Sequence, residues 1–254
     1  MAKNLLDFTG QVVLITGGRS GIGQATAIAF AEQGAKVVIA GRSHANETLA
    51  KIKELGGEGC FIKTDVSVAA DVKNLVDTIV SKYGRLDVAF NNSGLLPVTA
   101  DLVDQTEEDF QQIMDVDVKG VFLCMKEQIK QMLKQESGGA IINCGSMVSF
   151  VADPGMGPYV AAKHGVAGLT RAAGIEYAKH KIRINMIAPG LTATEMTERW
   201  LADPEFCKLV KSQNFVNRWA EPEEIAGSVL FLASPLASFT AGAIFVIDGG
   251  QTAH

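Results

Sequence analysis

The sequence predicts an α/β fold in which a parallel sheet of seven strands carries helices on both faces. Seven short apolar runs, rich in β-branched residues, alternate along the chain with longer stretches of helical periodicity. The runs are apolar throughout, as expected for strands that are buried on both faces. No linker, internal repeat or low-complexity stretch interrupts this alternation, so residues 1–254 are predicted to form a single domain.

The predicted elements alternate strictly along the chain. The strands are expected at residues 11–16, 36–40, 59–63, 86–90, 140–144, 182–187 and 243–247. The helices are expected at residues 24–33, 47–55, 69–83, from 106 to near 136, from 159 to near 180, and from 221 onwards. Residues 191–218 show no regular pattern.

Local signals indicate where the predicted helices begin and end. Gly34 and Gly84 follow the first and third helices, where glycine commonly ends a helix. The sequence Thr106-Glu107-Glu108-Asp109 resembles an N-terminal capping sequence. Pro222 lies near the first turn of the last helix, a position that proline favours.

Composition and charge argue against several classes of partner. Hydrophobic residues make up 47% of the chain and charged residues 20%, which is ordinary for a globular protein. The net charge is −5 and no basic block is present, so neither nucleic acid nor an anionic membrane is expected as a main partner. The N-terminus has no apolar run long enough for a signal peptide, and no segment approaches the roughly 18 apolar residues of a membrane span.

The cysteines and histidines indicate a reducing compartment without a structural metal. The four cysteines form no Cys-x-x-Cys pair, and no His/Cys cluster has zinc spacing. We therefore expect a cytoplasmic protein with free thiols, no disulfide and no metal site.

A glycine-rich turn follows the first predicted strand. The segment Gly17-Gly18-Arg19-Ser20-Gly21-Ile22-Gly23 stands between that strand and the first helix. Glycines let the backbone approach a pyrophosphate, and a helix N-terminus offers free N–H groups and the positive end of its dipole. The turn therefore predicts a phosphate-binding site.

The end of the second predicted strand favours NADP(H). NAD-binding folds place an acid near this point to hold the ribose 2′-hydroxyl, but here Gly41 and Arg42 follow the strand and no acid occurs before Glu47. Arg19 and Arg42 together suit a 2′-phosphate, because guanidinium groups bind phosphate oxygens well. The alternative is that both arginines are surface residues and that NAD(H) is also used.

Tyr159 and Lys163 are four residues apart on a predicted helix and therefore lie on one face. A neighbouring cation lowers the pKa of a tyrosine from its reference of about 10, so that the phenol exchanges a proton near neutral pH. Ser146, after the strand 140–144, is expected to hydrogen-bond the oxygen that is protonated. The pair alone also fits a half-buried ring beside a lysine. Polar residues follow nearly every predicted strand, however, and ligands bind at that end of such sheets, which favours catalysis.

Together these features resemble the short-chain dehydrogenase/reductase family in its single-domain form. The resemblance covers almost the whole chain and rests on the motifs Thr16-Gly17-x-x-x-Gly21-x-Gly23, Asp65, Asn91-Asn92-Ser93-Gly94, Ser146, Tyr159-x-x-x-Lys163, Pro189-Gly190 and Asp248-Gly249-Gly250. It implies a Rossmann-type, doubly wound sheet and hydride transfer between a nicotinamide and a carbonyl carbon.

The resemblance also implies roles for individual residues. Tyr159 is the general acid or base, Lys163 lowers its pKa and binds the nicotinamide ribose, and Ser146 polarises the substrate oxygen. The remaining cofactor contacts that it implies are made by Gly17, Ser20, Ile22 and Gly23 at the pyrophosphate, Asp65 and Val66 at the adenine, Asn92 and Gly94 at the adjoining ribose, and Pro189, Gly190, Thr192 and Thr194 at the nicotinamide.

Asp117 departs from the family pattern. The family usually has asparagine here, which helps to hold a water chain from the active-site lysine to solvent. We place Asp117 among the catalytic residues and expect a charged Asp117 to pair with Lys163 and raise the pKa of Tyr159. Activity would then survive with a moved pH optimum. The alternative is that Asp117 is a tolerated near-isostere of asparagine and does not affect the pH optimum.

The substrate is expected to be a small, substantially apolar carbonyl compound or alcohol. Candidate wall residues are Leu95, Leu96, Met147, Val151, Met156 and Trp200. The resemblance places a mobile lid at about residues 191–215. It also suggests a homotetramer, in which the glycine- and alanine-rich helix after Tyr159 and the long helix of Asp117 pack between subunits.

Three functions remain open at this point. The first is an NADP(H)-dependent carbonyl reductase that also works as an alcohol dehydrogenase. The second is a 3-oxoacyl-thioester reductase, for which cations near the lid would receive an acidic acyl carrier; these are Arg199, Lys208, Lys211 and Arg218. The third is a nucleotide-binding regulatory protein with little turnover, which the intact Ser146, Tyr159 and Lys163 argue against.

Overall fold

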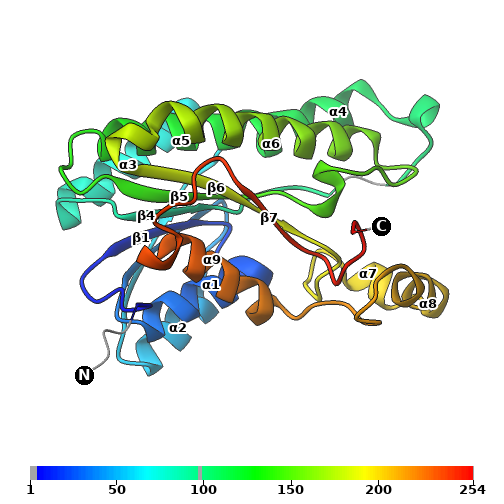
Figure 1. Cartoon of the computed structure of the whole chain (residues 1–254), viewed down its shortest axis with the longest axis horizontal. Helices are drawn as coiled ribbons and strands as arrows, with labels where there is room; N and C mark the ends of the chain where they lie inside the picture. Colours follow the sequence, from blue (N-terminus) through cyan, green and yellow to red (C-terminus); the bar gives the residue numbers. More distant parts are fainter. Residues whose placement is uncertain (1–4, 97–98, 254) are drawn as a thin grey trace.

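One parallel sheet organises the chain. The computed structural model describes residues 5–96 and 99–253. Within these residues seven strands pair in the order β3-β2-β1-β4-β5-β6-β7, and every pairing is parallel (Figure 1). The strand order reverses between β1 and β4, which is the point where such sheets open a crevice at their carboxyl ends. The predicted doubly wound parallel sheet is confirmed.

The elements have the following bounds. The strands are β1 Val12–Thr16, β2 Lys36–Gly41, β3 Glu58–Lys63, β4 Val88–Asn91, β5 Gly139–Cys144, β6 Ile182–Pro189 and β7 Ile244–Ile247. The helices are α1 Gly21–Glu32, α2 Asn46–Glu54, α3 Ala69–Tyr83, α4 Glu107–Ile113, α5 Gly120–Met132, α6 Gly157–Tyr177, α7 Glu198–Leu201, α8 Pro204–Gln213 and α9 Pro222–Ala233. A π-helical turn, η2, covers Met114–Lys119, and short 3₁₀ turns are η1 Leu102–Asp104, η3 Met147–Ser149, η4 Ala178–His180 and η5 Pro235–Ala237.

Two hydrophobic cores lie on opposite faces of the sheet. Val13 and Ile15 of β1 belong to the core shared with α1 and α9, whereas Val12 and Leu14 belong to the core shared with α3, α5 and α6. Successive side chains of a strand point to opposite faces, so β1 must be apolar at every position to serve both cores. Figure 1 shows α1, α2 and α9 on one side of the sheet and α3, α5 and α6 on the other.

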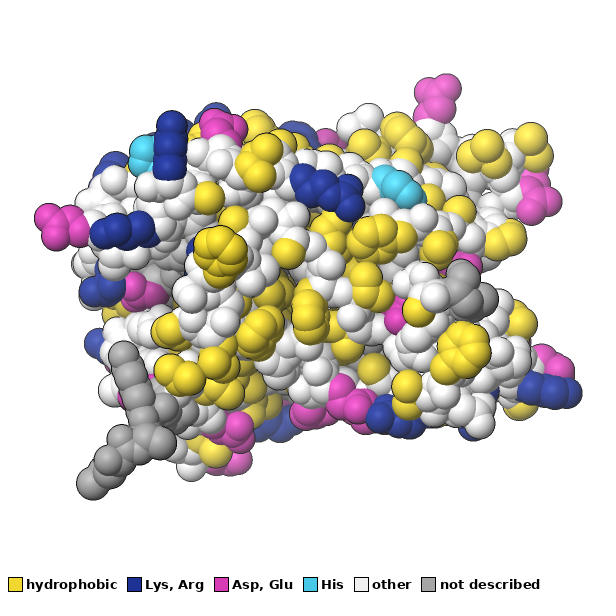
Figure 2. All heavy atoms as spheres, viewed as in Figure 1, with side chains coloured by type: hydrophobic (Ala, Val, Ile, Leu, Met, Phe, Trp, Pro, Cys, Tyr) yellow, Lys and Arg dark blue, Asp and Glu magenta, His cyan; other side chains and the backbone are white. Residues whose placement is uncertain are grey.

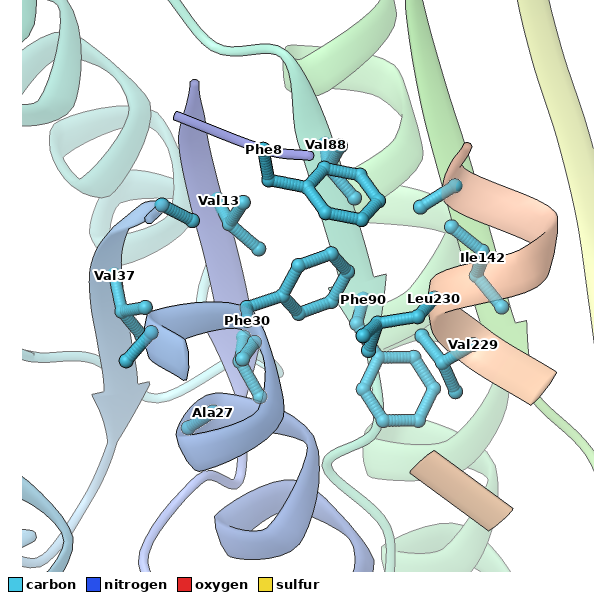
Figure 3. Packing of buried hydrophobic residues seen from close by; sticks show 14 of the residues in the cluster. Phe8, Val13, Ala27, Phe30, Val37, Val88, Phe90, Ile142, Val229 and Leu230 are labelled. Carbon is cyan, nitrogen blue, oxygen red and sulfur yellow. The ribbon is translucent and has the colours of Figure 1, made fainter. Parts of the chain in front are cut away.

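The core under α1 is fixed by an aromatic pair. Phe8 and Phe30 meet edge to face with ring centroids 4.8 Å apart and an angle of 81° between the rings (Figure 3). Both side chains are buried. This contact joins the segment before β1 to the C-terminal part of α1, and so holds α1 against the sheet. A Phe-to-Ala change at such a core position costs about 3–5 kcal/mol.

Two segments differ from the sequence prediction. The helix expected from 106 to near 136 is interrupted by the π-helical turn η2, which an apolar pattern does not reveal because the turn holds only one more residue than an α-helical turn. Residues 191–218, which had no regular pattern, contain α7 and α8. The Asp203 side chain accepts a hydrogen bond from the Glu205 backbone N–H at 2.9 Å, and Pro204 starts α8, so the start signal was present in the sequence.

Candidate active site

A cavity of about 920 Å³ opens at the carboxyl ends of the strands. Segments that follow β1 to β6 line it, together with residues of α6, α7 and α8. Nearly all the predicted site residues lie in its wall: Gly17, Arg19, Ser20, Ile22, Arg42, Asp65, Val66, Asn92, Gly94, Asp117, Ser146, Tyr159, Lys163, Pro189, Gly190, Thr192 and Thr194. Gly23 is the exception among the predicted set and lies behind the wall.

The glycine-rich turn forms a cradle that a side chain would fill. Gly17 has a positive φ of 70°, and a Cβ there would lie 3.0 Å from Nδ2 of Asn92. A Cβ at Gly23 would lie only 2.2 Å from the carbonyl oxygen of Gly17, so Gly23 serves the packing of α1 against the turn rather than contact with a ligand. Ser20, the N-cap of α1, makes no capping hydrogen bond through its side chain. The first turn of α1 therefore suits an anionic group such as a pyrophosphate.

Side chains of β1 and of the segment after β4 fix this cradle. The Asn92 side-chain amide donates to the carbonyl oxygens of Thr16 and Gly17, both at 3.1 Å. The Thr16 hydroxyl accepts from the backbone N–H groups of Asn92 and Ser93, both at 3.0 Å. The turn is thus tied to the neighbouring strand at the switch point of the sheet, and a dinucleotide fits the residues present.

Arg19 and Arg42 both line the cavity but have different surroundings. Arg19 Nη2 lies 2.6 Å from Oε2 of Glu195, and both side chains are about half exposed. Arg42 forms no ion pair within the described part of the chain. A hydrogen bond from Ser67 lowers the pKa of Asp65, and the nearby Arg42 cation lowers it further. Glu195 was not identified from the sequence, because only the fold brings it to the glycine-rich turn.

Ser146, Tyr159 and Lys163 meet at the centre of the cavity wall. Ser146 follows β5 and caps η3, where its Oγ accepts from the Val148 N–H at 3.4 Å. Tyr159 and Lys163 lie in the first two turns of α6, and Lys163 Nζ is 5.2 Å from the centroid of the Tyr159 ring. Lys163 also donates to the carbonyl oxygen of Cys144 at 3.3 Å. The ammonium group is thereby held between the end of β5 and the phenol.

Asp117 pairs with Lys163 from the π-helical turn. Its Oδ2 lies 3.0 Å from Lys163 Nζ, and its Oδ1 accepts from the Leu95 N–H at 2.8 Å. Asp117 is 0% exposed and Lys163 is 5% exposed. A Cβ at Gly94 would lie 3.1 Å from Oδ2 of Asp117, so the glycine at 94 lets the Asp117 carboxylate lie close to the backbone there. The predicted ion pair is present in the structure.

Burial and charge compete for the proton of Tyr159. Burial raises its pKa, the Lys163 cation acts in the opposite direction, and the Asp117 carboxylate raises it again. Lys163 and Asp117 thus act in the directions expected from the sequence, but the net pKa is raised because burial, which the sequence did not reveal, has the largest effect. Burial is the largest single influence on the pKa of Lys163 and lowers it, but the interactions with Asp117, Tyr159 and Cys144 together outweigh burial, so this pKa is raised overall. Lys163 therefore stays an ammonium group at neutral pH.

Apolar side chains line the part of the cavity beyond Tyr159. Five of the six predicted wall residues are in place: Leu95, Leu96, Met147, Met156 and Trp200. Val151 does not line the cavity and is 40% exposed. Helix α8 contributes Phe206, Leu209 and Val210, which sequence reasoning missed because it did not recognise this helix. Trp200 and Phe206 stack with centroids 5.5 Å apart and join α7 to α8.

Signals for other kinds of site are few. All four cysteines are free. Over residues 5–96 and 99–253, no group of three or more His, Cys, Asp or Glu side chains is arranged to hold a metal ion. In the same residues no helix combines the length and the hydropathy that crossing a membrane requires.

Comparison with known protein sequences identifies relatives over nearly the full chain. Residues 17–252 match the sequence profile of a family described as Enoyl-(Acyl carrier protein) reductase. The chain is 40% identical over 247 residues to the short chain dehydrogenase/reductase astE of Aspergillus oryzae, covering 95% of this chain and 94% of that protein. It is also 40% identical over 249 residues to a 3-oxoacyl-(acyl-carrier-protein) reductase of Synechocystis, covering 96% and 97% of the two chains.

Solved structures with the same fold hold either nicotinamide cofactor. The crystal structure of an Agrobacterium tumefaciens protein with bound NADP superposes with a TM-score of 0.93 at 36% identity, covering 99% of this chain and all of that one. A carveol dehydrogenase from Mycobacterium avium in complex with NAD gives a TM-score of 0.93 at 26% identity, covering 98% and 99% of the two chains.

Proposed function

Because the chain belongs to the short-chain dehydrogenase/reductase family, we propose that it interconverts a ketone and a secondary alcohol with NADP(H), using Tyr159 as general acid and base. At the coarser level, it is an NAD(P)-dependent oxidoreductase that acts on alcohol and ketone groups. One observation supports the finer proposal most: Ser146, Tyr159 and Lys163 meet beside a glycine cradle in one cavity.

The site residues divide the chemistry between them. In the direction of reduction, the Tyr159 phenol donates its proton to the carbonyl oxygen, and in oxidation the phenolate takes the proton of the hydroxyl. The raised pKa of Tyr159 keeps the phenol protonated at neutral pH, the form that donates the proton in reduction. When bound, the nicotinamide supplies the hydride to the carbonyl carbon. Ser146 orients the carbonyl oxygen, and Lys163 stabilises the phenolate left by proton transfer.

The arginines support a preference for NADP(H) over NAD(H). No acid stands at the end of β2 to accept a hydrogen bond from a ribose 2′-hydroxyl. Arg42 and Arg19 border the same part of the cavity and offer guanidinium groups to a 2′-phosphate. Arg42 is the stronger candidate, because Arg19 already pairs with Glu195.

Initial rates with a panel of ketones test the proposal directly. NADPH and NADH are compared with wild type and Tyr159→Phe. We expect oxidation of NADPH to exceed that of NADH, and Tyr159→Phe to lose about 10²–10⁴-fold in kcat because the proton donor is gone. NADPH binding, followed by its fluorescence, should be kept in this variant. Absence of turnover with every ketone and both cofactors would favour the regulatory interpretation.

A 3-oxoacyl-thioester is the second candidate substrate. The matched family profile and the Synechocystis relative both carry acyl-carrier names. The cations near the lid give this candidate little support. Arg218 binds the Glu224 carboxylate through two hydrogen bonds of 2.7 Å, Lys211 lies 5.2 Å from the Trp219 ring, and neither lines the cavity. A short 3-oxoacyl thioester in the ketone panel distinguishes the two.

Assembly and location complete the proposal. We propose a homotetramer in the cytoplasm. Four free cysteines agree with a reducing compartment. Exposed apolar side chains, such as Phe122 of α5 and Phe245 of β7, agree with subunit contacts.

A further inference from the structure

The loop between η3 and α6 brings one carboxylate into the substrate part of the cavity. Asp153, Pro154 and Met156 of this loop line the cavity, and the Met156 N–H donates to the Asp153 carbonyl oxygen at 3.4 Å. The Asp153 side chain is half-buried. The loop follows η3, which Ser146 caps, and leads into the helix of Tyr159, so it lies between two of the catalytic groups along the chain.

Asp153 has no counter-charge among the described residues. The other charged groups that line the cavity each have a neighbour of opposite charge. Arg19 pairs with Glu195, Lys163 pairs with Asp117, and Arg42 lies near Asp65. No ion pair or side-chain hydrogen bond involves the Asp153 carboxylate within the part of the chain that the structure describes. Burial raises the pKa of this carboxyl group.

Apolar side chains make up much of the rest of the cavity wall, among them Leu95, Leu96, Met147, Trp200 and Phe206. A half-buried carboxylate in such a wall is unfavourable unless it finds a hydrogen-bond donor. A donor on the substrate would meet this need. A pocket that is built to hydrogen-bond a polar group of its substrate discriminates strongly against analogues that lack this polar group. It discriminates less against analogues that differ by one methylene.

Resting on the proposed function, we propose that Asp153 determines substrate specificity by accepting a hydrogen bond from a donor group of the substrate that is remote from the reacting carbonyl. The substrate is then an apolar ketone or secondary alcohol that carries one further hydroxyl or ammonium group. This narrows the expected class of a substantially apolar substrate to one that carries a remote hydrogen-bond donor.

Three ring ketones separate the contribution of a remote hydroxyl group from that of a remote ammonium group. Cyclohexanone has no remote donor, 4-hydroxycyclohexanone carries a hydroxyl opposite the carbonyl, and 4-aminocyclohexanone carries an ammonium group at neutral pH. Each is measured with wild type, Asp153→Ala, Asp153→Asn and the control Asp104→Ala, which removes an exposed carboxylate outside the cavity. The readouts are kcat/KM with NADPH and, without turnover, the dissociation constant for the NADP⁺-loaded protein by calorimetry.

We expect wild type to prefer a donor-bearing ketone over cyclohexanone by about 10–100-fold, and Asp153→Ala to lose this preference while keeping its activity on cyclohexanone. Asp153→Asn should keep most of a preference for the hydroxyl, because an amide oxygen still accepts, but should lose a preference for the ammonium group. Asp104→Ala should behave as wild type.

The outcomes separate this proposal from the proposed function. An equal preference in wild type and Asp153→Ala, or no preference in wild type, overturns the role of Asp153. A binding preference that depends on Asp153 but occurs without turnover supports that role and contradicts the proposed ketone reduction. Activity on all three ketones without discrimination supports the proposed function and contradicts this inference.

Discussion

The pair of Asp117 and Lys163 determines how charge is distributed around Tyr159. A buried ammonium group beside a phenol stabilises the phenolate, but here it also faces a fully buried carboxylate at 3.0 Å. The Lys163 and Asp117 charges act on the phenol in opposite directions, and burial, the largest influence, raises the pKa of Tyr159. An asparagine at this position would keep the hydrogen bond from Leu95 and remove the opposing charge.

Asp117→Asn is therefore expected to move the pH dependence toward lower pH. The Asp117 carboxylate raises the pKa of Tyr159, so its removal lowers that pKa. Ketone reduction needs the protonated phenol and should begin to fall at a lower pH than in wild type. Alcohol oxidation needs the phenolate and should become active at a lower pH. The measurement is kcat/KM against pH in both directions.

The matched control is Asp115→Asn on the same π-helical turn. Asp115 pairs with Lys119 at 3.1 Å on the surface, away from the cavity. Its substitution removes the same charge from the same element and should leave both pH profiles in place. Superimposable profiles for wild type and Asp117→Asn would show that Asp117 is a tolerated near-isostere.

At the residue scale, the sequence predicted which side chains meet, but not whether burial or charge has the larger effect on the pKa of Tyr159. The spacing of Tyr159 and Lys163 predicted a shared helix face, and the structure agrees. The direction of the Tyr159 pKa depends on burial, which spacing does not report. The pairing of Arg19 with Glu195 joins residues far apart in the chain, and only the fold brings them together.

At the scale of elements, the segment after β6 is attached to the glycine-rich turn. Arg19 of the turn pairs with Glu195, and a Cβ at Gly21 would lie 2.9 Å from the Thr194 side chain. The Thr197 hydroxyl donates to the Thr192 carbonyl oxygen at 2.6 Å, which holds this segment in a compact turn before α7. The lid expected at residues 191–215 thus touches the cofactor side of the cavity as well as the substrate side.

Glu195→Gln is expected to strengthen NADPH binding selectively. Glu195 competes with a 2′-phosphate for Arg19, so loss of its charge frees the guanidinium group. A half-exposed ion pair is worth about 0.2–1 kcal/mol, which corresponds to at most about a fivefold decrease in the KM for NADPH. The KM for NADH should not change. Steady-state kinetics with both cofactors give the comparison.

Two further variants test the mechanism behind this expectation. Glu198→Gln, in the first turn of α7, removes a nearby charge without touching Arg19 and should leave both KM values unchanged. In Arg19→Ala, the additional change Glu195→Gln should have no further effect, because the competition is already absent. A parallel decrease in the KM values for NADPH and NADH would show that Glu195 acts on lid mobility and not on the phosphate.

Two of the elements that the sequence missed have a physical explanation. A π-helical turn adds one residue to a turn and leaves the apolar pattern on both sides recognisable as helix. Helix α7 has four residues, too few for a periodic pattern. The inner strands, by contrast, are buried on both faces and need unbroken apolar runs. These strands, and the partly exposed edge strands β3 and β7, were predictable within one or two residues at each end.

At the scale of the whole molecule, the described residues include exposed apolar side chains on two faces that could form subunit contacts. One surrounds the sheet edge at β7, which pairs with β6 alone, and includes the exposed side chains of Ile175, Phe239 and Phe245. Figure 2, seen from the side on which Figure 1 shows β7 and α9, displays hydrophobic side chains gathered across the middle of the molecule. The other face lies on α4 and α5 and includes Phe110 and Phe122.

Two separate self-complementary faces are what a tetramer of paired dimers requires. If each face forms one kind of subunit contact, a charge placed in one face should leave the other intact. We expect Phe245→Glu and Phe122→Glu each to reduce the assembly to a dimer, because burying an unpaired carboxylate at a subunit interface is strongly unfavourable. The double variant should be a monomer with the 27.0 kDa mass of one chain. Light scattering after size-exclusion chromatography measures these masses.

Leu55→Glu provides the control for this experiment. Leu55 follows α2 and is 49% exposed, a degree similar to Phe245 and Phe122, but it belongs to neither face. Its variant should keep four times the mass of one chain. A wild-type mass of one chain would contradict the homotetramer, and a tetramer that survives Phe245→Glu would place the subunit contact away from the β7 edge. Because the Tyr159 site lies in a cavity of a single chain, dimers that keep their fold should also keep cofactor binding, which separates assembly from catalysis.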